Sequence, residues 1–172
     1  MGTYVIDGIP PGEYLLGVNI SHTPTKAHPY PPTYFPNGND AAQATPIRIG
    51  KGVSVQEIDL EIDGRLPLVI VQGHILNADG KPPKAEDRPA VRIKEPGLYR
   101  QIEDTTILID SKGRFQIELC AGVPYSAFAF SGRDSKKLYS APLEFVPTKE
   151  NDKVELILNK TSEEFGKLSR ED

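Results

Sequence analysis

The segment Gly113–Phe130, GRFQIELCAGVPYSAFAF, decides the fold because it reads as two strands joined by a glycine-containing turn. Apolar and polar side chains alternate along Phe115–Leu119, and a second strand-like run follows at Tyr125–Phe130. A period of two residues places successive side chains on opposite faces of a sheet. We expect the large aromatic residues of this segment to point inward and to bury apolar area between two sheets: Phe115, Tyr125 and Phe128.

The same alternation recurs in short runs along the chain, and it is clearest at Ile58–Ile62. Turns such as Asp79-Gly80 separate the runs, because glycine readily adopts the positive φ that tight turns need. No run of ten or more residues shows the apolar spacing of an amphipathic helix. We therefore expect an all-β sandwich. The other predicted strands are Tyr4–Ile6, Glu13–Ile20, Ile47–Ile49, Leu68–Leu76, Val91–Lys94, Thr106–Ile109, Leu143–Val146 and Val154–Leu158.

An internal repeat relates the two parts of the chain. The segment GTYVIDGIPPGEYLL, from Gly2, matches GRFQIELCAGVPYSA, from Gly113, so that Tyr4 corresponds to Phe115. The alternating segments VQEIDLEI and DKVELILN end the two copies. The second copy also has a front half, Leu68–Asp110, that has no counterpart upstream of Gly2.

The repeat predicts a partial first sandwich over residues 1–63 and a complete second sandwich over residues 67–159, followed by a charged tail over residues 160–172. A polar hinge, Asp63–Pro67, separates the two sandwiches. Because its front strands are lacking, we expect the first sandwich to be a severed domain that exposes sheet edges and apolar surface. Such a surface predicts packing on the second domain or on a neighbouring chain, or a strand exchanged between copies, as in a dimer.

Several segments, taken in order, resemble the carboxypeptidase regulatory-like, transthyretin-like modules of bacterial surface proteins. These segments are VQGHILNADGKPP, AVRI, IDSKGRFQI and AGVPY. The residues that carry the resemblance are Gly73, Asp79, Gly80, Pro82, Ala90, Val91, Ile93, Asp110, Gly113, Phe115, Gly122 and Tyr125. The resemblance implies a Greek-key, immunoglobulin-like sandwich that serves as a periplasmic or secreted accessory module and not as a catalytic domain.

A long connection over residues 22–45 is the most unusual segment, since it combines many prolines with three aromatic side chains, Tyr30, Tyr34 and Phe35. Its proline density predicts a rigid loop. Exposed aromatic rings on a rigid loop would suit a site for a sugar or for a partner protein. The alternative is that Tyr34 and Phe35 fold back over the edge of the sandwich as packing groups.

Composition excludes several classes of partner and cofactor. The net charge is −4 and the pI is near 5.5, which argues against a nucleic-acid partner because such a partner demands a basic face. No apolar run reaches the length of a membrane span. The single cysteine, Cys120, excludes an intrachain disulfide, and the three histidines share no ligand spacing. We expect no metal and no cofactor, and we interpret Glu57, Asp59, Glu61 and Asp63 as a solvated strand face.

A catalytic alternative comes from a second resemblance. The segment GHILNADGKPP is faintly similar to the N-terminal strand of transthyretin-like hydroxyisourate hydrolases, and His74 would then be the general base. Asn77 stands where that strand has Asp, and the chain ends in LSRED instead of the Tyr-Arg-Gly-Ser tetrapeptide of those enzymes. We therefore expect no catalysis. The sequence favours an accessory module that spaces, presents or docks domains of a larger envelope or secreted protein, with glycan binding through Tyr30, Tyr34 and Phe35 as the alternative.

Overall fold

The chain forms two compact units in a computed structural model. Unit 1 comprises Met1–Pro24 and Tyr30–Arg65, and unit 2 comprises Thr25–Pro29 and Leu66–Asp172. The division between Arg65 and Leu66 falls within the polar hinge. The structure describes residues 3–55, 57–94, 107, 109–133, 137–148 and 153–168.

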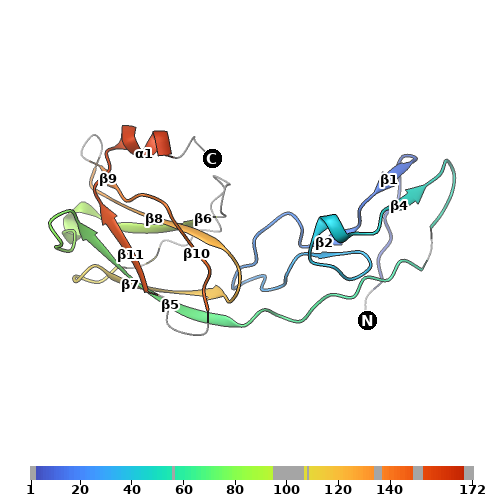
Figure 1. Ribbon diagram of the computed structural model, residues 1–172, viewed down its shortest axis with the longest axis horizontal. Coiled ribbons are helices and arrows are strands. Elements are labelled where there is room, and N and C mark those ends of the chain that lie inside the picture. The colour runs from blue at the N-terminus through green and yellow to red at the C-terminus, as the bar shows by residue number, and fades with distance from the viewer. Residues whose placement is uncertain are drawn as a thin grey trace. The chain divides into compact units, whose positions relative to one another are not determined.

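Unit 2 is an all-β sandwich of two sheets (Figure 1). One sheet has the order β11-β5-β7, in which β5 is parallel to β11 and antiparallel to β7. The other sheet has the order β10-β8-β6, and β9 also pairs with β8. The strands of unit 2 are β5 (Leu68–Asn77), β6 (Ala90–Lys94), β7 (Arg114–Cys120), β8 (Tyr125–Ser131), β9 (Leu138–Tyr139), β10 (Leu143–Phe145) and β11 (Lys153–Leu158), and a 3₁₀ turn, η2, spans Ala85–Asp87.

One hydrophobic cluster fills the space between these sheets, as the alternation predicts. On β11, Val154, Leu156 and Leu158 are buried, while the residues between them are exposed. The predicted inward positions of Phe115 and Tyr125 are confirmed, because both belong to this cluster. The ring of Tyr125 lies 6.2 Å from that of Phe145, centroid to centroid.

The hydroxyl of Tyr125 is satisfied inside the core, because it accepts a hydrogen bond of 3.1 Å from the backbone N–H of Cys120. Burial raises the pKa of Tyr125 well above its usual value, and it also raises the pKa of the Cys120 thiol. Both groups therefore stay neutral and serve packing.

The prediction that Phe128 points into this core is wrong. Tyr125, Ala127 and Ala129 take the inward positions of β8, so that Phe128 lies on the opposite face. It is nevertheless buried, because its ring packs 4.9 Å from the ring of Phe165, centroid to centroid. An odd separation along a strand always places two side chains on different faces.

Phe165 belongs to a short helix, α1 (Ser162–Leu168), within the expected charged tail. Thr161 and Glu164 form a capping box at its start: the Glu164 N–H donates to the Thr161 hydroxyl at 3.3 Å, and the Glu164 carboxylate accepts from the Thr161 N–H at 2.7 Å. The bonds that the Glu164 carboxylate accepts, first from the Thr161 N–H and then from the Thr161 hydroxyl, lower the pKa of Glu164. The tail is thus a capped helix that docks through its aromatic residue, and residues 169–172 lie outside the described residues.

Unit 1 has little regular structure. Its elements are β1 (Gly12–Tyr14), β2 (Gly17–Val18), β3 (Thr33–Tyr34), the 3₁₀ turn η1 (Ala41–Gln43) and β4 (Ile47–Ile49). β1 pairs with β4 and β2 with β3, both antiparallel. Among its described residues only Pro24, Pro31 and Thr33 are buried, and none belongs to the hydrophobic cluster.

Two predicted strands of unit 1 do not form. Tyr4–Ile6 and Ile58–Ile62 are outside any ladder, although the Tyr4 hydroxyl donates a hydrogen bond to the Ile58 carbonyl. The predicted strand Glu13–Ile20 is divided between β1 and β2. Of the predicted strand Thr106–Ile109, positions 106 and 108 lie outside the described residues, and Ile107 and Ile109 are in no strand. A strand needs a hydrogen-bonding partner as well as an alternating sequence.

We predict that Gly73→Ala destabilises unit 2. Gly73 lies on β5 opposite Phe115, and an added Cβ would overlap the Phe115 ring and stand 2.7 Å from the Val154 carbonyl oxygen. The free energy of unfolding should fall by about 1–3 kcal/mol, measured by urea denaturation. Gly64→Ala is the control, since its added Cβ meets no atom within 4 Å. Equal stabilities of the two variants would contradict the prediction.

Candidate functional site

The loop over residues 22–45, predicted as the binding segment, is held by backbone hydrogen bonds. The Phe35 N–H donates to the Leu16 carbonyl at 2.9 Å, and the Thr45 N–H donates to the Phe35 carbonyl at 2.8 Å. The Asp40 carboxylate accepts from the Ala42 N–H at 2.9 Å and so caps η1. The Phe35–Pro36 peptide bond is cis. The loop is therefore an ordered segment, most of which belongs to unit 1.

Residues 25–29 of the same loop belong to unit 2. There the Pro29 carbonyl accepts a hydrogen bond of 2.7 Å from the Leu66 N–H, and Lys26 forms an ion pair with Glu118 of β7. The predicted loop thus has two parts, and the three candidate rings all lie in the part within unit 1.

The three predicted site residues, Tyr30, Tyr34 and Phe35, are all partly buried. The Arg65 guanidinium donates to the Tyr30 hydroxyl at 2.9 Å, and its carbon lies 5.7 Å from the ring centroid of Tyr30. Tyr34 lies on β3, with Phe35 next to it. Among the described residues, no close ring pair involves these three side chains, so the structure presents separate half-exposed rings and no joint stacking platform.

His74, the residue of the catalytic alternative, is exposed on β5. Its neighbours across the sheet are Arg114 on β7 and Glu155 on β11. An open depression runs over this sheet and is also lined by Lys26, Glu118 and Lys153. Sequence reasoning missed this depression, since its charged residues come from segments far apart in the chain.

Asn77 is the last residue of β5, and the turn that follows begins from it. Its N–H donates to the Lys81 carbonyl at 2.7 Å, and its carbonyl accepts from the Gly80 N–H at 2.9 Å. Gly80 has a φ of 76°. Asn77 therefore has a turn-forming role at the place where the hydrolase-like strand has Asp.

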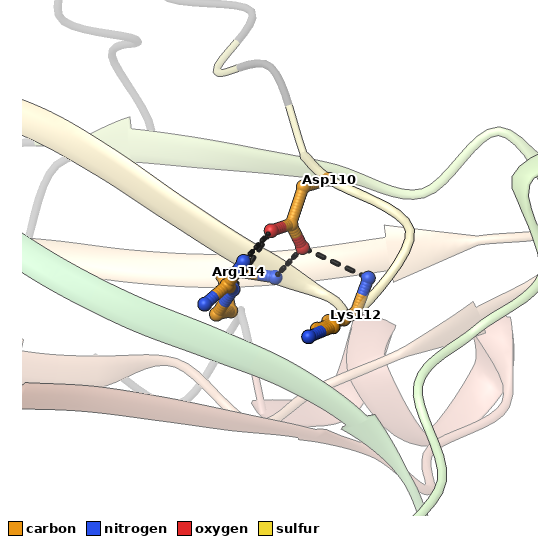
Figure 2. A network of polar contacts seen from close by, with 3 residues as sticks. All are labelled: Asp110, Lys112 and Arg114. Atoms are coloured by element: carbon orange, nitrogen blue, oxygen red, sulfur yellow. Dashed lines mark hydrogen bonds and ion pairs between the residues drawn. The ribbon is translucent and has the colours of Figure 1, made fainter.

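The Asp-x-x-Gly motif before β7 is likewise a turn, and Figure 2 shows its polar network. One carboxylate oxygen of Asp110 accepts from the N–H groups of Lys112 and Arg114, both at 2.9 Å, and the other accepts from the Arg114 Nε at 2.7 Å. Gly113 supplies the positive φ of 77° that the turn requires. These bonds, first of all the one from the Arg114 backbone, lower the pKa of Asp110.

A cluster of aromatic rings and cations on the outer face of the β6-β8-β9 sheet was not foreseen. Its rings are Phe128, Phe130, Tyr139 and Phe165, with centroids of contacting pairs 4.5–6.4 Å apart. Lys94 lies 4.7 Å from the Phe128 ring centroid, Arg92 lies 5.2 Å from that of Phe130, and Lys137 lies 4.4 Å from that of Phe130. Burial, and then the charge of Arg92, lower the pKa of Lys94. The apolar Phe165 within an acidic tail was the signal that could have revealed this cluster.

Within the part of the chain that the structure describes, no three His, Cys, Asp or Glu side chains gather as metal ligands. No helix there is long and apolar enough to cross a membrane. Two polar motifs that carry the family resemblance form turns of the β-sandwich. They are Asp79-Gly80 and Asp110-x-x-Gly113.

No protein-family model, curated protein or solved structure matches this chain. The class that the structure defines is therefore the all-β sandwich of unit 2, preceded by the sparsely paired unit 1.

The Asp110 network predicts a pH dependence of stability. The folded pKa of Asp110 lies below its usual value of 3.8, so the carboxylate stabilises the fold above that pH. This stabilisation is lost as the pH falls through the lowered folded pKa. Asp110→Asn should lack this acid-dependent component of the free energy of unfolding, whereas the neighbouring Ser111→Ala should keep it. Identical acid dependence in Asp110→Asn and the wild-type chain, measured by denaturation at pH 2–5, would refute this role.

Proposed function

We propose that this chain is a non-catalytic accessory module, of the carboxypeptidase regulatory-like type, that docks other protein domains through unit 1. The observation that carries the proposal is the exposed apolar surface of unit 1. Its exposed large apolar side chains are Tyr4, Val5, Ile6, Leu15, Ile20, Val53, Val55 and Ile62. Exposed apolar side chains are places where a partner can bind, because bare apolar area is costly in water.

Unit 2 supports the other half of the proposal, which is that the chain spaces or presents domains. Its hydrophobic core and its hydrogen-bonded turns support this half of the proposal, because a spacer must hold its own shape. The positive φ angles of Gly80, Gly113 and Gly122 agree with the turn roles that the resemblance assigns to these positions. Placement in the periplasm or outside the cell belongs to the same proposal and rests on that resemblance.

The docking role predicts a dependence on two apolar side chains of unit 1. Ile6 and Ile62 are 56% and 48% exposed, so replacing both by Glu should leave the fold of unit 2 unchanged. The double variant Ile6→Glu, Ile62→Glu should lose capture of partner proteins from a cell-envelope extract. Ile70→Glu is the matched control, because Ile70 is 50% exposed but lies on unit 2. Equal capture by the wild-type chain, the double variant and Ile70→Glu would refute docking through unit 1.

A second function, glycan binding, is favoured by the partial exposure of Tyr30, Tyr34 and Phe35 on a hydrogen-bonded loop. Aromatic rings that retain an open face stack on the apolar faces of sugars, and one ring contact is worth about 1 kcal/mol.

For a glycan identified on an array, Tyr30→Ala or Tyr34→Ala should weaken binding by about fivefold, measured by titration calorimetry. Tyr4→Ala removes an exposed tyrosine outside the loop and should leave the affinity unchanged. An affinity that survives both loop substitutions would place the sugar site elsewhere.

A further inference from the structure

The aromatic and cationic cluster on the outer face of the β6-β8-β9 sheet brings two positive side chains to one ring. Arg92 of β6 and Lys137, just before β9, lie 5.2 Å and 4.4 Å from the ring centroid of Phe130 on β8. Phe130 pairs with Ala90 of β6 and with Tyr139 of β9, so the two cations come from the strands on both sides of it. The sheet register therefore fixes a positive patch over this ring.

These charges gather without a neutralising carboxylate among the described residues. The ion pairs of unit 2 there use cations other than Arg92 and Lys137. The two carboxylates of α1 are engaged within their own segment, since Glu163 pairs with Lys167 and Glu164 caps the helix. The docked helix thus leaves the positive patch uncompensated.

Lys94 shows the electrostatic consequence of this arrangement. It follows Arg92 by two residues on β6 and therefore shares its face of the sheet. Burial, and then the charge of Arg92, lower the pKa of Lys94, and both effects act against the positive charge. A carboxylate placed beside these cations acts in the opposite direction, so a bound anion would relieve the repulsion between them.

The rings of the cluster are already engaged with one another. Tyr139 stacks on Phe165 with 4.5 Å between centroids and 15° between ring planes, and Phe128 packs 4.9 Å from Phe165. A sugar stacks on an open ring face, so these contacts disfavour a sugar as the ligand of this surface. Arg92, in contrast, is exposed. The positive groups are therefore the ones that meet a ligand.

Three observations favour a short peptide as the carrier of the negative charge. Arg92 and Lys94, two residues apart on a strand, are separated by about 6.6–7 Å, which is also the spacing of alternate side chains in an extended peptide. A peptide segment, α1, already seats an aromatic side chain on this face through Phe165. The net charge of −4 opposes a long polyanion, whereas a few carboxylates match a patch of three cations.

We propose that the outer face of the β6-β8-β9 sheet binds an acidic segment of a partner protein, with Asp or Glu at alternate positions. The carboxylates of this segment accept charge-assisted hydrogen bonds from Arg92, Lys94 and Lys137. The neighbouring rings exclude water and so strengthen these interactions. The surface belongs to unit 2, so the inference is independent of docking through unit 1 and adds a second partner surface.

The probe is a fluorescein-labelled synthetic peptide in which Glu alternates with Thr, titrated with the full chain and followed by fluorescence anisotropy. The double variant Arg92→Gln, Lys137→Gln should bind it about tenfold more weakly, because two charged contacts are lost. The matched control is Lys112→Gln, Lys153→Gln, which removes two positive charges from exposed positions of unit 2 outside the cluster. This control should keep the wild-type affinity.

NMR spectra of the full chain locate the bound peptide and show whether each variant is folded. The Nε–H signal of Arg92 and the amide signals of Phe130 and Tyr139 should shift when the peptide is added, while the amide signals of Lys112 and Lys153 stay in place. Added salt should reverse these shifts, because it screens the ionic contacts.

Four results would overturn the inference. Three of them are no binding of the Glu peptide, equal binding of a peptide with Gln in place of Glu, and equal affinities of the two double variants. The fourth concerns polygalacturonate, an acidic polysaccharide: if it shifts the Arg92 and Phe130 signals while the Glu peptide does not, the surface takes an acidic glycan and the assignment to a partner protein is wrong.

Discussion

The double hydrogen-bonding of β5 is the constraint on which the sandwich depends. This strand carries two ladders, antiparallel to β7 and parallel to β11, and its inward residues Val71 and Ile75 lie in the hydrophobic cluster. Because both neighbours use it, loss of β5 would leave each with a row of unpaired backbone groups. Gly73 allows the close approach, since the Phe115 ring and the Val154 carbonyl occupy the space that a side chain would need.

The contrast between local pattern and pairing explains which parts of the structure could be predicted. The inward positions of Phe115 and Tyr125 follow from alternation alone, and both are correct. The alternation along Tyr4–Ile6 and Ile58–Ile62 is as regular as that around Phe115, but these two segments form no ladder. Backbone pairing depends on a strand that can be distant in sequence, and alternation does not reveal it. The aromatic character of Phe128 predicts an inward position, but its odd spacing from Tyr125 on the same strand places it on the opposite face.

The candidate sites show the same limit. The motifs that carry the family resemblance are visible in the sequence because each is local. In the structure they form turns, as the Asp110 carboxylate shows by accepting hydrogen bonds from three N–H groups of Lys112 and Arg114. The aromatic and cationic cluster is different, since it joins β6, β8, β9 and α1. No single stretch contains the contact between Phe128 and Phe165, although the tail alone offers two local signals, the apolar Phe165 and the capping pair Thr161 and Glu164.

The internal repeat allows a comparison within one molecule, because some of its segments form strand ladders in both units and others do so only in unit 2. Tyr14 and Tyr125 each lie on a strand paired with the segment after the long connection, so the shared sequence specifies that pairing in both contexts. Tyr4 and Phe115 differ in burial although their sequence context is alike: Phe115 pairs with β5, whereas Tyr4 lies in no ladder. Burial of an alternating segment therefore depends on the pairing of the strand that carries it as well as on the alternation itself.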